Sequence, residues 1–220
     1  MIEIQHAENQ PGPEQSRLLV FARVPLLGRV KSRLAATIGN EAALATYREL
    51  LAITREAVVA SGVPATVWLA DTAGAAPTAA EAGEWPGLAV RCQPAGDLGE
   101  RMTAAFAHAF AEGAGRVVII GTDCPGLRAA HLAQAFASLA ENDLVLGPAT
   151  DGGYYLLGLQ APRPTLFQDK PWSTATVLAE TVAEARRLGL RVALLPELRD
   201  VDDATDLAEW RAQTHAAPAQ

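Results

Sequence analysis

A short apolar run, VVIIG over residues 117–121, is the feature that most restricts how this chain can fold. It is rich in β-branched residues and apolar at every position before the glycine, so a strand formed from it would be buried on both faces. Such strands lie inside parallel sheets that helices cover on both sides. Further runs of strand length occur at 18–22, around Val67, at 88–92 and at 144–147.

Segments with helical spacing of apolar residues alternate with these runs. Helices are expected over 40–61, after the capping pair Asp97 and Glu100, over 132–139, over 177–188 and from 206 to 211. Because parallel strands need covered crossovers, the alternation predicts an α/β fold, a three-layer sandwich with a mostly parallel, mixed central sheet.

Two segments depart from this alternation. Residues 74–87, rich in Ala, Pro and Gly, are expected to form a loop with little regular structure. The run at 154–159 follows the run at 144–147 after a short TDGG segment, which is too short for a crossover. One antiparallel strand is therefore expected within the sheet.

The chain of 220 residues is near the upper size of one compact α/β unit. We expect a single domain over residues 17–213, with a flexible leader over 1–16 and a flexible tail over 214–220. No apolar run approaches the roughly 20 residues that span a bilayer, and residues 1–16 have neither a basic start nor an apolar centre. A cytoplasmic protein without a membrane partner is expected.

Composition and spacing exclude several classes of function. The formal charge of −7, from 25 acidic and 18 basic side chains, argues against a nucleic-acid partner. Cys92 and Cys124 lack the spacing of a zinc site, and neither G-x-S-x-G nor H-E-x-x-H occurs. Cys124 stands beside Asp123 and could act as a nucleophile, but a buried structural thiol is the favoured interpretation.

Polar residues follow the apolar runs directly, at the strand ends where open α/β sheets bind their ligands. Carboxylates there could hold Mg²⁺ or Mn²⁺, and the cations could hold phosphate oxygens, so the pattern favours a nucleotide site. Each acid could equally be a helix cap or a turn former, and Asp200 with Asp202 could form a phosphatase pair. The residues are Arg23, Lys31, Arg33, Asp123, Asp151, Asp200, Asp202 and Asp203.

The loop PLLGRVKSRL, residues 25–34, places Arg29, Lys31 and Arg33 just before or within the first turn of a helix, a position that suits phosphate. It is not a Walker A loop, because that motif requires glycines where Pro25 and Val30 stand. The alternative is a solvated basic helix start.

Six blocks together resemble one known family. They are VFARVPLLGRVKSRL (20–34), GDLGERM (96–102), GTDCPGL (121–127), LGPATDGGYYLLGL (146–159), PWST (171–174) and DVDDATDL (200–207). Over residues 18–210 the chain resembles the radical-SAM or selenodomain-associated transferases, often labelled glycosyltransferases of arsenosugar biosynthesis. That family is similar to the nucleotide-diphospho-sugar transferase superfamily, with its glycosyltransferase A-type fold.

The superfamily also contains nucleotidyltransferases such as the molybdenum cofactor and 2-phospholactate guanylyltransferases. The basic loop of the latter ends in Lys, Ser or Thr, Arg and Leu, as residues 31–34 do. The chain departs from the family mildly at Arg23 and Ser32, where Lys and Thr are more frequent, and at 203–204, where Asp-Ala replaces a frequent Thr-Pro pair.

The resemblance implies roles for individual residues. Asp123 and Asp202 would bind Mg²⁺ or Mn²⁺, Lys31 and Arg33 would bind phosphate, and Asp151 would lie in the acceptor half with Gly152, Gly153 and Tyr154. Trp172 and Tyr154 could line a pocket or pack in the core, and a helix cap is the simpler interpretation of Ser173. The full nucleotide-binding set is Arg23, Gly28, Lys31, Arg33, Arg101, Gly121, Gly152, Gly153, Tyr154, Trp172 and Ser173.

The expected reaction is metal-assisted transfer from a nucleotide donor to a small-molecule acceptor. Glycosyl transfer from a nucleotide sugar is favoured by the family label: Asp151 would take the acceptor's proton, and Lys31 and Arg33 would share the charge of the departing diphosphate. The alternative is nucleotidyl transfer from a nucleoside triphosphate with release of pyrophosphate. A non-catalytic nucleotide-binding domain is a third hypothesis. The sequence leaves the oligomeric state open.

Overall fold

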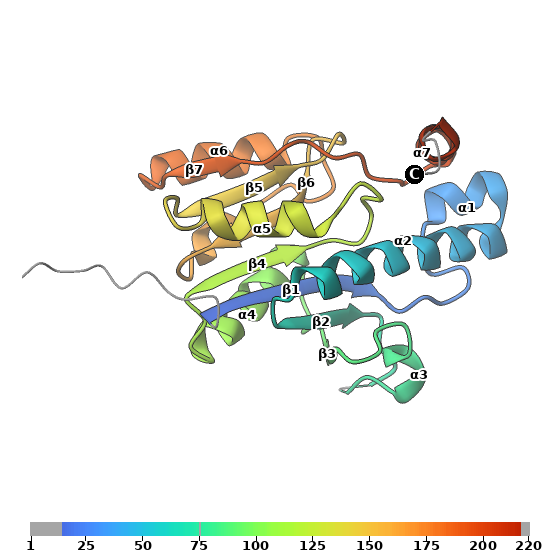
Figure 1. Cartoon of the computed structure of the whole chain (residues 1–220), viewed down its shortest axis with the longest axis horizontal. Helices are drawn as coiled ribbons and strands as arrows, with labels where there is room; N and C mark the ends of the chain where they lie inside the picture. The colour runs from blue at the N-terminus through green and yellow to red at the C-terminus, as the bar shows by residue number, and fades with distance from the viewer. Residues whose placement is uncertain (1–14, 75, 217–220) are drawn as a thin grey trace, which may run out of the picture.

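A single mixed sheet organises the molecule. The computed structural model describes residues 15–74 and 76–216, and within them seven strands follow the order β3-β2-β1-β4-β6-β5-β7 (Figure 1). All neighbouring strands are parallel except for β6, which is antiparallel to β4 and β5. The strands are β1 Ser16–Arg23, β2 Ala65–Ala70, β3 Ala89–Cys92, β4 Arg116–Ile120, β5 Leu144–Pro148, β6 Tyr154–Leu159 and β7 Val192–Leu194.

Helices cover both faces of this sheet. They are α1 Ser32–Ile38, α2 Asn40–Ser61, α3 Ala79–Ala82, α4 Leu98–Ala111, α5 Ala129–Ser138, the 3-10 helix η2 Pro164–Phe167, α6 Val177–Arg187 and α7 Ala204–Ala216. The α/β sandwich with a mostly parallel, mixed sheet and the antiparallel strand after TDGG are thus confirmed.

The two helical layers enclose two separate apolar cores. Successive residues of β1 point to opposite faces, so Leu18 and Leu19 enter different cores. Leu18 packs in the core that contains Leu51 of α2 and Leu132 of α5. Leu19 packs in the core that contains Phe106 of α4 and Leu166 of η2. Burial on both sides explains the continuous apolar runs of the central strands.

One predicted loop contains a helix. Residues 74–87 were expected to lack regular structure, but α3 forms within them. Thr78 accepts a hydrogen bond from the Glu81 N–H at 3.2 Å, and the Thr78 N–H donates to Glu81 Oε2 at 2.8 Å. This reciprocal capping box satisfies two backbone N–H groups at the start of α3, those of Thr78 and Glu81, and so stabilises a short helix within a segment rich in Ala, Pro and Gly.

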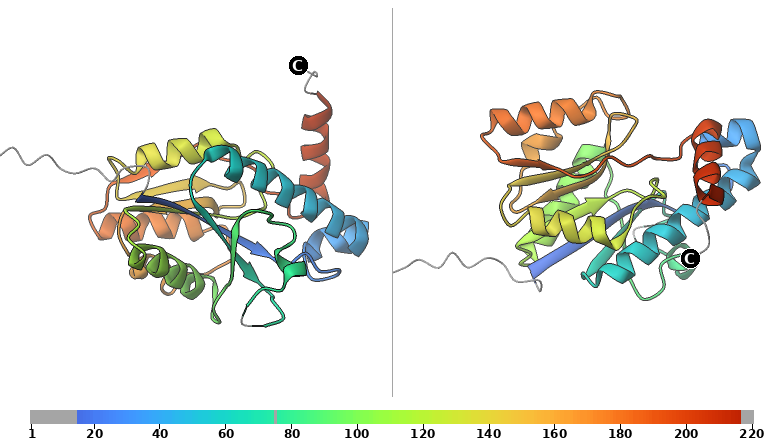
Figure 2. Two further views of the ribbon diagram at one scale, coloured as in Figure 1. Left: turned by 60° about the horizontal axis from the view of Figure 1, so that its bottom comes forward. Right: turned by 45° about the horizontal axis from the view of Figure 1, so that its top comes forward.

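Near its start the described part of the chain enters the sheet as β1, and it ends in helix α7. α7 is longer than the short helix that the sequence predicted, and it stands beside α1 at the side toward which β1, β2 and β4 point (Figures 1 and 2). The expected leader and tail lie mostly outside the described residues, although β1 already begins at Ser16 and α7 reaches Ala216. None of the helices in residues 15–74 and 76–216 has the length and apolarity needed to cross a bilayer.

Candidate functional site

Two aspartates from distant parts of the chain meet at one lysine. Lys31 Nζ lies 2.5 Å from Asp123 Oδ1 and 2.7 Å from Asp202 Oδ1. Asp123 follows β4, and Asp202 precedes α7. The Lys31 side chain is only 5% exposed, whereas the two carboxylates are 47% and 37% exposed. The ammonium is therefore a buried link between two carboxylates that still face the solvent.

The local backbone turns Lys31 inward. Lys31 adopts φ 48° and ψ 49°, in the left-handed region that is uncommon for a residue with a side chain. Just before it, Gly28 turns the loop with φ 72°, and buried Val30 anchors it to the core. Lys31 also caps α1, because its carbonyl accepts the first hydrogen bond of the helix from the Ala35 N–H.

Backbone contacts also fix the two carboxylates. The Val201 N–H donates to the Asp123 carbonyl at 2.9 Å, which ties the segment before α7 to the end of β4. Asp206 Oδ2 accepts hydrogen bonds from the N–H groups of Asp202 and Asp203. The start of α7 thus holds Asp202 against Lys31.

Opposing effects act on the pKa of Lys31. Burial alone would lower this pKa, but the attraction and hydrogen bonding of Asp123 and Asp202 outweigh the burial and raise it. Lys31 therefore keeps its charge inside the protein.

Tyr47 of α2 contacts the ends of β1 and β4 beside Lys31 and Asp123. Its hydroxyl accepts a hydrogen bond from the Arg23 N–H at 2.9 Å, and it lies 3.5 Å from Thr122 Oγ1. Burial raises the pKa of Tyr47, so its hydroxyl stays protonated. Sequence reasoning missed this role, because Tyr47 fits the apolar face of its helix and nothing in the spacing reveals where its hydroxyl points.

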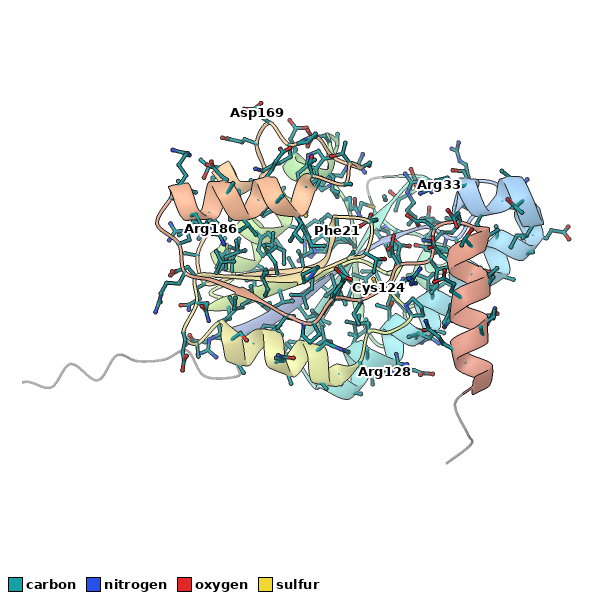
Figure 3. All side chains as sticks on the ribbon, turned by 90° about the horizontal axis from the view of Figure 1, so that it is seen from above. Phe21, Arg33, Cys124, Arg128, Asp169 and Arg186 are labelled. Carbon is teal, nitrogen blue, oxygen red and sulfur yellow. The ribbon has the colours of Figure 1, made fainter. Side chains whose placement is uncertain are left out.

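Three arginines of the predicted nucleotide-binding set contact surface carboxylates or a backbone carbonyl. Arg23 Nε lies 3.4 Å from Asp71, and Arg33 Nη2 lies 3.2 Å from Asp203. Arg101 donates from Nε to the Gly96 carbonyl at 2.8 Å. Together with Lys31 these side chains line an open cavity of about 570 Å³, which we call the basic cavity. Figure 3 shows Arg33 beside α1.

A second cavity of about 340 Å³ adjoins the first, and we call it the acidic cavity. Asp123 and Asp202 lie on the border of both cavities. Burial, followed by the nearby charge of Asp151, raises the pKa of Asp200 to about 6. Other described residues that line the acidic cavity include Phe21, Gly121, Cys124, Gly153, Tyr154, Trp172 and Ser173. Figure 3 labels Phe21 and Cys124.

Two predicted glycines line neither cavity. Gly28 lies in the turn of the loop over residues 25–34, and Gly152 lies in the hairpin turn between β5 and β6. A Cβ atom on Gly152 would collide with the carbonyl oxygen of Ala175, and its φ of 87° is also a conformation that favours glycine. Gly152 thus allows the segment around Trp172 to approach the hairpin.

The structure corrects the interpretation of Ser173 as a helix cap. Helix α6 begins at Val177, with Thr176 at its N-cap position. Ser173 instead adopts a left-handed φ of 66° and lies at the border of both cavities. The neighbouring Trp172 packs so closely on Gly99 that a Cβ atom there would lie 2.8 Å from the indole ring.

Cys124 has the environment of a structural thiol. Its side chain is buried, and burial followed by the charge of Asp123 raises the pKa of the thiol well above its usual value. A neutral thiol is a poor nucleophile, so the structure favours the packing interpretation.

The carboxylates of Asp123 and Asp202 fit a magnesium or manganese ion. Carboxylate oxygens are the ligands that these ions prefer, and Asp123 and Asp202 already converge on one positive charge. Among the described residues, no group of three or more His, Cys, Asp or Glu side chains is arranged to hold an ion alone. An ion held by two carboxylates would therefore complete its coordination with nucleotide phosphates and water.

Comparison with known proteins gives one family and a curated relative. The model of a family described as an uncharacterized protein conserved in bacteria, DUF2064, matches residues 54–174. The phosphoenolpyruvate guanylyltransferase of Chloroflexus aggregans is 32% identical over 197 residues, which cover 85% of this chain and 93% of that protein.

Solved structures support the fold. A crystal structure of a candidate nucleotide-diphospho-sugar transferase from Desulfovibrio desulfuricans G20 has a TM-score of 0.84 and 32% identity, covering 92% of this chain and 89% of that one. Rv0371c from Mycobacterium tuberculosis, solved in complex with manganese, has a TM-score of 0.53 and 17% identity, covering 92% of this chain and 100% of that one. The second likeness extends to the fold alone.

Proposed function

The chain belongs to the DUF2064 family of bacterial proteins, and from its likeness to the Chloroflexus guanylyltransferase we propose that it is a nucleotidyltransferase, which moves a nucleoside monophosphate from a triphosphate donor to a small phosphorylated acceptor. The name of the Chloroflexus relative makes GTP the first donor to test. The same name favours nucleotidyl transfer over glycosyl transfer, the reaction expected from the label of the resembling family. A nucleoside triphosphate donor agrees with the expected cytoplasmic location and requires neither nucleic acid nor membrane.

The position of Lys31 is the observation that carries this proposal. Its ammonium joins Asp123 and Asp202 at the border between the basic and the acidic cavity. The basic cavity offers Arg23, Lys31, Arg33 and Arg101 to a triphosphate. A donor bound there would present its α-phosphate at the two carboxylates, beside the cavity left for the acceptor.

The residues of the chain divide the chemistry between them. An Mg²⁺ or Mn²⁺ ion held by Asp123 and Asp202 would neutralise the charge that develops on the phosphate. Lys31 and Arg33 hold the oxygens of the departing pyrophosphate, and the walls of the acidic cavity align the acceptor. An acceptor phosphate is already ionised at neutral pH, so this reaction needs no general base. Asp151 then contacts the acceptor without taking a proton from it.

Glycosyl transfer is the second candidate. The Desulfovibrio protein, at 32% identity, is described as a candidate nucleotide-diphospho-sugar transferase, in agreement with the arsenosugar-type label of the family that the chain resembles. In that reaction a nucleoside diphosphate leaves, and Asp151 takes the proton of an acceptor hydroxyl.

The identity of the by-product distinguishes these reactions. The purified protein is incubated with each nucleoside triphosphate or nucleotide sugar, with Mg²⁺ or Mn²⁺ and a panel of phosphorylated acceptors. Acceptor-dependent release of pyrophosphate from GTP is the expected result. Release of a nucleoside diphosphate from a nucleotide sugar would replace the proposal by glycosyl transfer. Nucleotide binding without either product would indicate a non-catalytic domain.

A further inference from the structure

The two adjoining cavities differ sharply in charge. The described lining of the basic cavity includes Lys31 and three arginines. The described lining of the acidic cavity includes four aspartates and no lysine, arginine or histidine. A substrate that extends from one cavity into the other therefore meets opposite electrostatic environments at its two ends.

Two of the four aspartates, Asp151 and Asp200, do not pair with Lys31. Asp123 and Asp202 are already paired with Lys31. Asp200 Oδ1 accepts a hydrogen bond from Thr150 Oγ1 at 3.2 Å, and Asp151 Oδ1 accepts one from the Gly153 N–H at 2.8 Å. Each thus keeps a second carboxylate oxygen, and neither is paired with a basic side chain within the described residues.

These carboxylates determine which acceptor groups are tolerated. A negatively charged acceptor group beside Asp151 and Asp200 is repelled in a cavity partly shielded from water. Hydroxyl groups, in contrast, donate hydrogen bonds that carboxylates accept strongly. The remaining walls are apolar and aromatic, with Phe21, Tyr154 and Trp172 among them, and such surfaces pack against the C–H groups of a compact carbon skeleton.

We propose that the acceptor is a phosphorylated polyol, a molecule rich in hydroxyl groups whose only charged group is its phosphate, rather than a phosphorylated carboxylic acid. This inference rests on the proposed nucleotidyl transfer. The acceptor phosphate lies toward Asp123 and Asp202, and the polyol lies between Asp151, Asp200 and the aromatic wall. A phosphate oxygen of the acceptor forms the new bond to the α-phosphorus, the bond between the α-phosphorus and its bridging oxygen breaks, and pyrophosphate leaves with both electrons.

The sharpest probe is a pair of acceptors that differ in one group. Glycerol 3-phosphate and 3-phosphoglycerate share their skeleton and phosphate, but the first has a hydroxymethyl group where the second has a carboxylate. Their dissociation constants are measured by calorimetry on the full chain, with Mg²⁺ and a non-hydrolysable GTP analogue bound. We expect glycerol 3-phosphate to bind at least about tenfold more tightly. Glucose 1-phosphate and phosphoenolpyruvate form a second such comparison.

Two variants test whether the preference for glycerol 3-phosphate depends on the charges of Asp151 and Asp200. Asp151→Asn and Asp200→Asn keep the size of each side chain and an oxygen for the observed hydrogen bonds, and they remove the charge. Each should tighten the binding of 3-phosphoglycerate severalfold and change the binding of glycerol 3-phosphate much less. Asp169→Asn, at a residue that lines neither cavity, is the matched control and should change neither constant.

The outcomes separate the acceptor inference from the proposed function. Equal or tighter binding of 3-phosphoglycerate, no binding of either acceptor, or variants that leave the preference unchanged would each overturn the acceptor inference. Pyrophosphate release is then measured with the acceptors that bind. If polyol phosphates bind as expected but no acceptor in the panel yields pyrophosphate, the preference of the acidic cavity for polyol phosphates stands, and the proposed nucleotidyl transfer fails.

Discussion

Lys31 and Asp202 are 171 positions apart in the chain, and their side chains meet at 2.7 Å. The contact joins the residue that caps α1 to the segment that precedes α7, two helices that stand side by side (Figure 2). The same ammonium also contacts Asp123 at the end of β4. One buried charge therefore connects the sheet to both helices at the border of the two cavities.

Removal of this charge should weaken both stability and donor binding. Lys31→Ala leaves Asp123 and Asp202 close together without a cation. Because both carboxylates are partly exposed, we expect a loss of about 1–2 kcal/mol in the free energy of unfolding, less than for a fully buried pair. Urea denaturation gives this loss, and calorimetry with GTP gives the affinity.

The salt dependence of GTP binding tests whether Lys31 contacts phosphate. Binding by the unmodified protein should weaken as salt rises, and this dependence should be smaller in Lys31→Ala. Equal GTP affinity of the two proteins at low salt would assign Lys31 a purely structural role.

Asp123 should be required for metal-dependent nucleotide binding and not for folding. Asp123→Asn keeps the size of the side chain and removes the charge that an ion needs, so titration of GTP should lose its response to Mn²⁺. The circular dichroism spectrum should stay unchanged, and Asp169→Asn should retain the response. Identical titration heats with and without the substitution would count against a metal at this position.

Gly152 should be intolerant of any side chain. In Gly152→Ala the new Cβ atom meets the Ala175 carbonyl in addition to adopting an unfavourable φ. Gly62→Ala is the matched control, because Gly62 also has a positive φ but nothing lies within 4 Å of its Cβ position. We expect Gly152→Ala to cost about 1–3 kcal/mol more than the control in thermal or urea unfolding. Similar costs would show that the segment around Trp172 yields easily.

The capping box of α3 should make stability depend on acid pH. Hydrogen bonds from the backbone of Thr78 and Ala73 lower the pKa of Glu81. Because the folded-state pKa lies below the unfolded-state value, the carboxylate stabilises the protein above the unfolded pKa, and this contribution disappears as the pH falls through the folded pKa.

Comparison of Glu81→Gln with the unmodified protein tests this dependence. The variant should be less stable at neutral pH, and the difference should shrink as the pH falls below the ordinary glutamate pKa of 4.5. Urea midpoints measured across this range would contradict the assignment if the difference stayed constant.

The order of the elements could be predicted because it depends on local patterns. The β-branched run before Gly121 and the TDGG segment specify a buried strand and a tight antiparallel return without reference to the rest of the chain. The rule that ligands bind at the carboxyl ends of strands also predicted that Asp123 and Asp202 lie close together. In the structure both side chains contact Lys31.

The features that were missed depend on tertiary contacts. Lys31 and Ser173 adopt left-handed backbones that no propensity favours, because the surrounding contacts compensate for the strain. The hydroxyl of Tyr47 reaches Arg23 only once α2 lies against β1. The helix within 74–87 did have a local signal, Thr78 and Glu81 three positions apart, but the Ala, Pro and Gly content of the segment outweighed it in the prediction.

The reversed direction of β6 has a consequence for how the acidic cavity could be altered by substitution. Since β6 returns directly from β5, the turn between them is a short hairpin tip and does not belong to a helical crossover. Asp151 occupies that tip beside Gly152, so its exposed side chain can change without repacking any layer of the sandwich, whereas Gly152 cannot accept a side chain. A substitution at Asp151 would therefore alter the charge of the acidic cavity, while the loop before α1 keeps its contacts with Asp123 and Asp202.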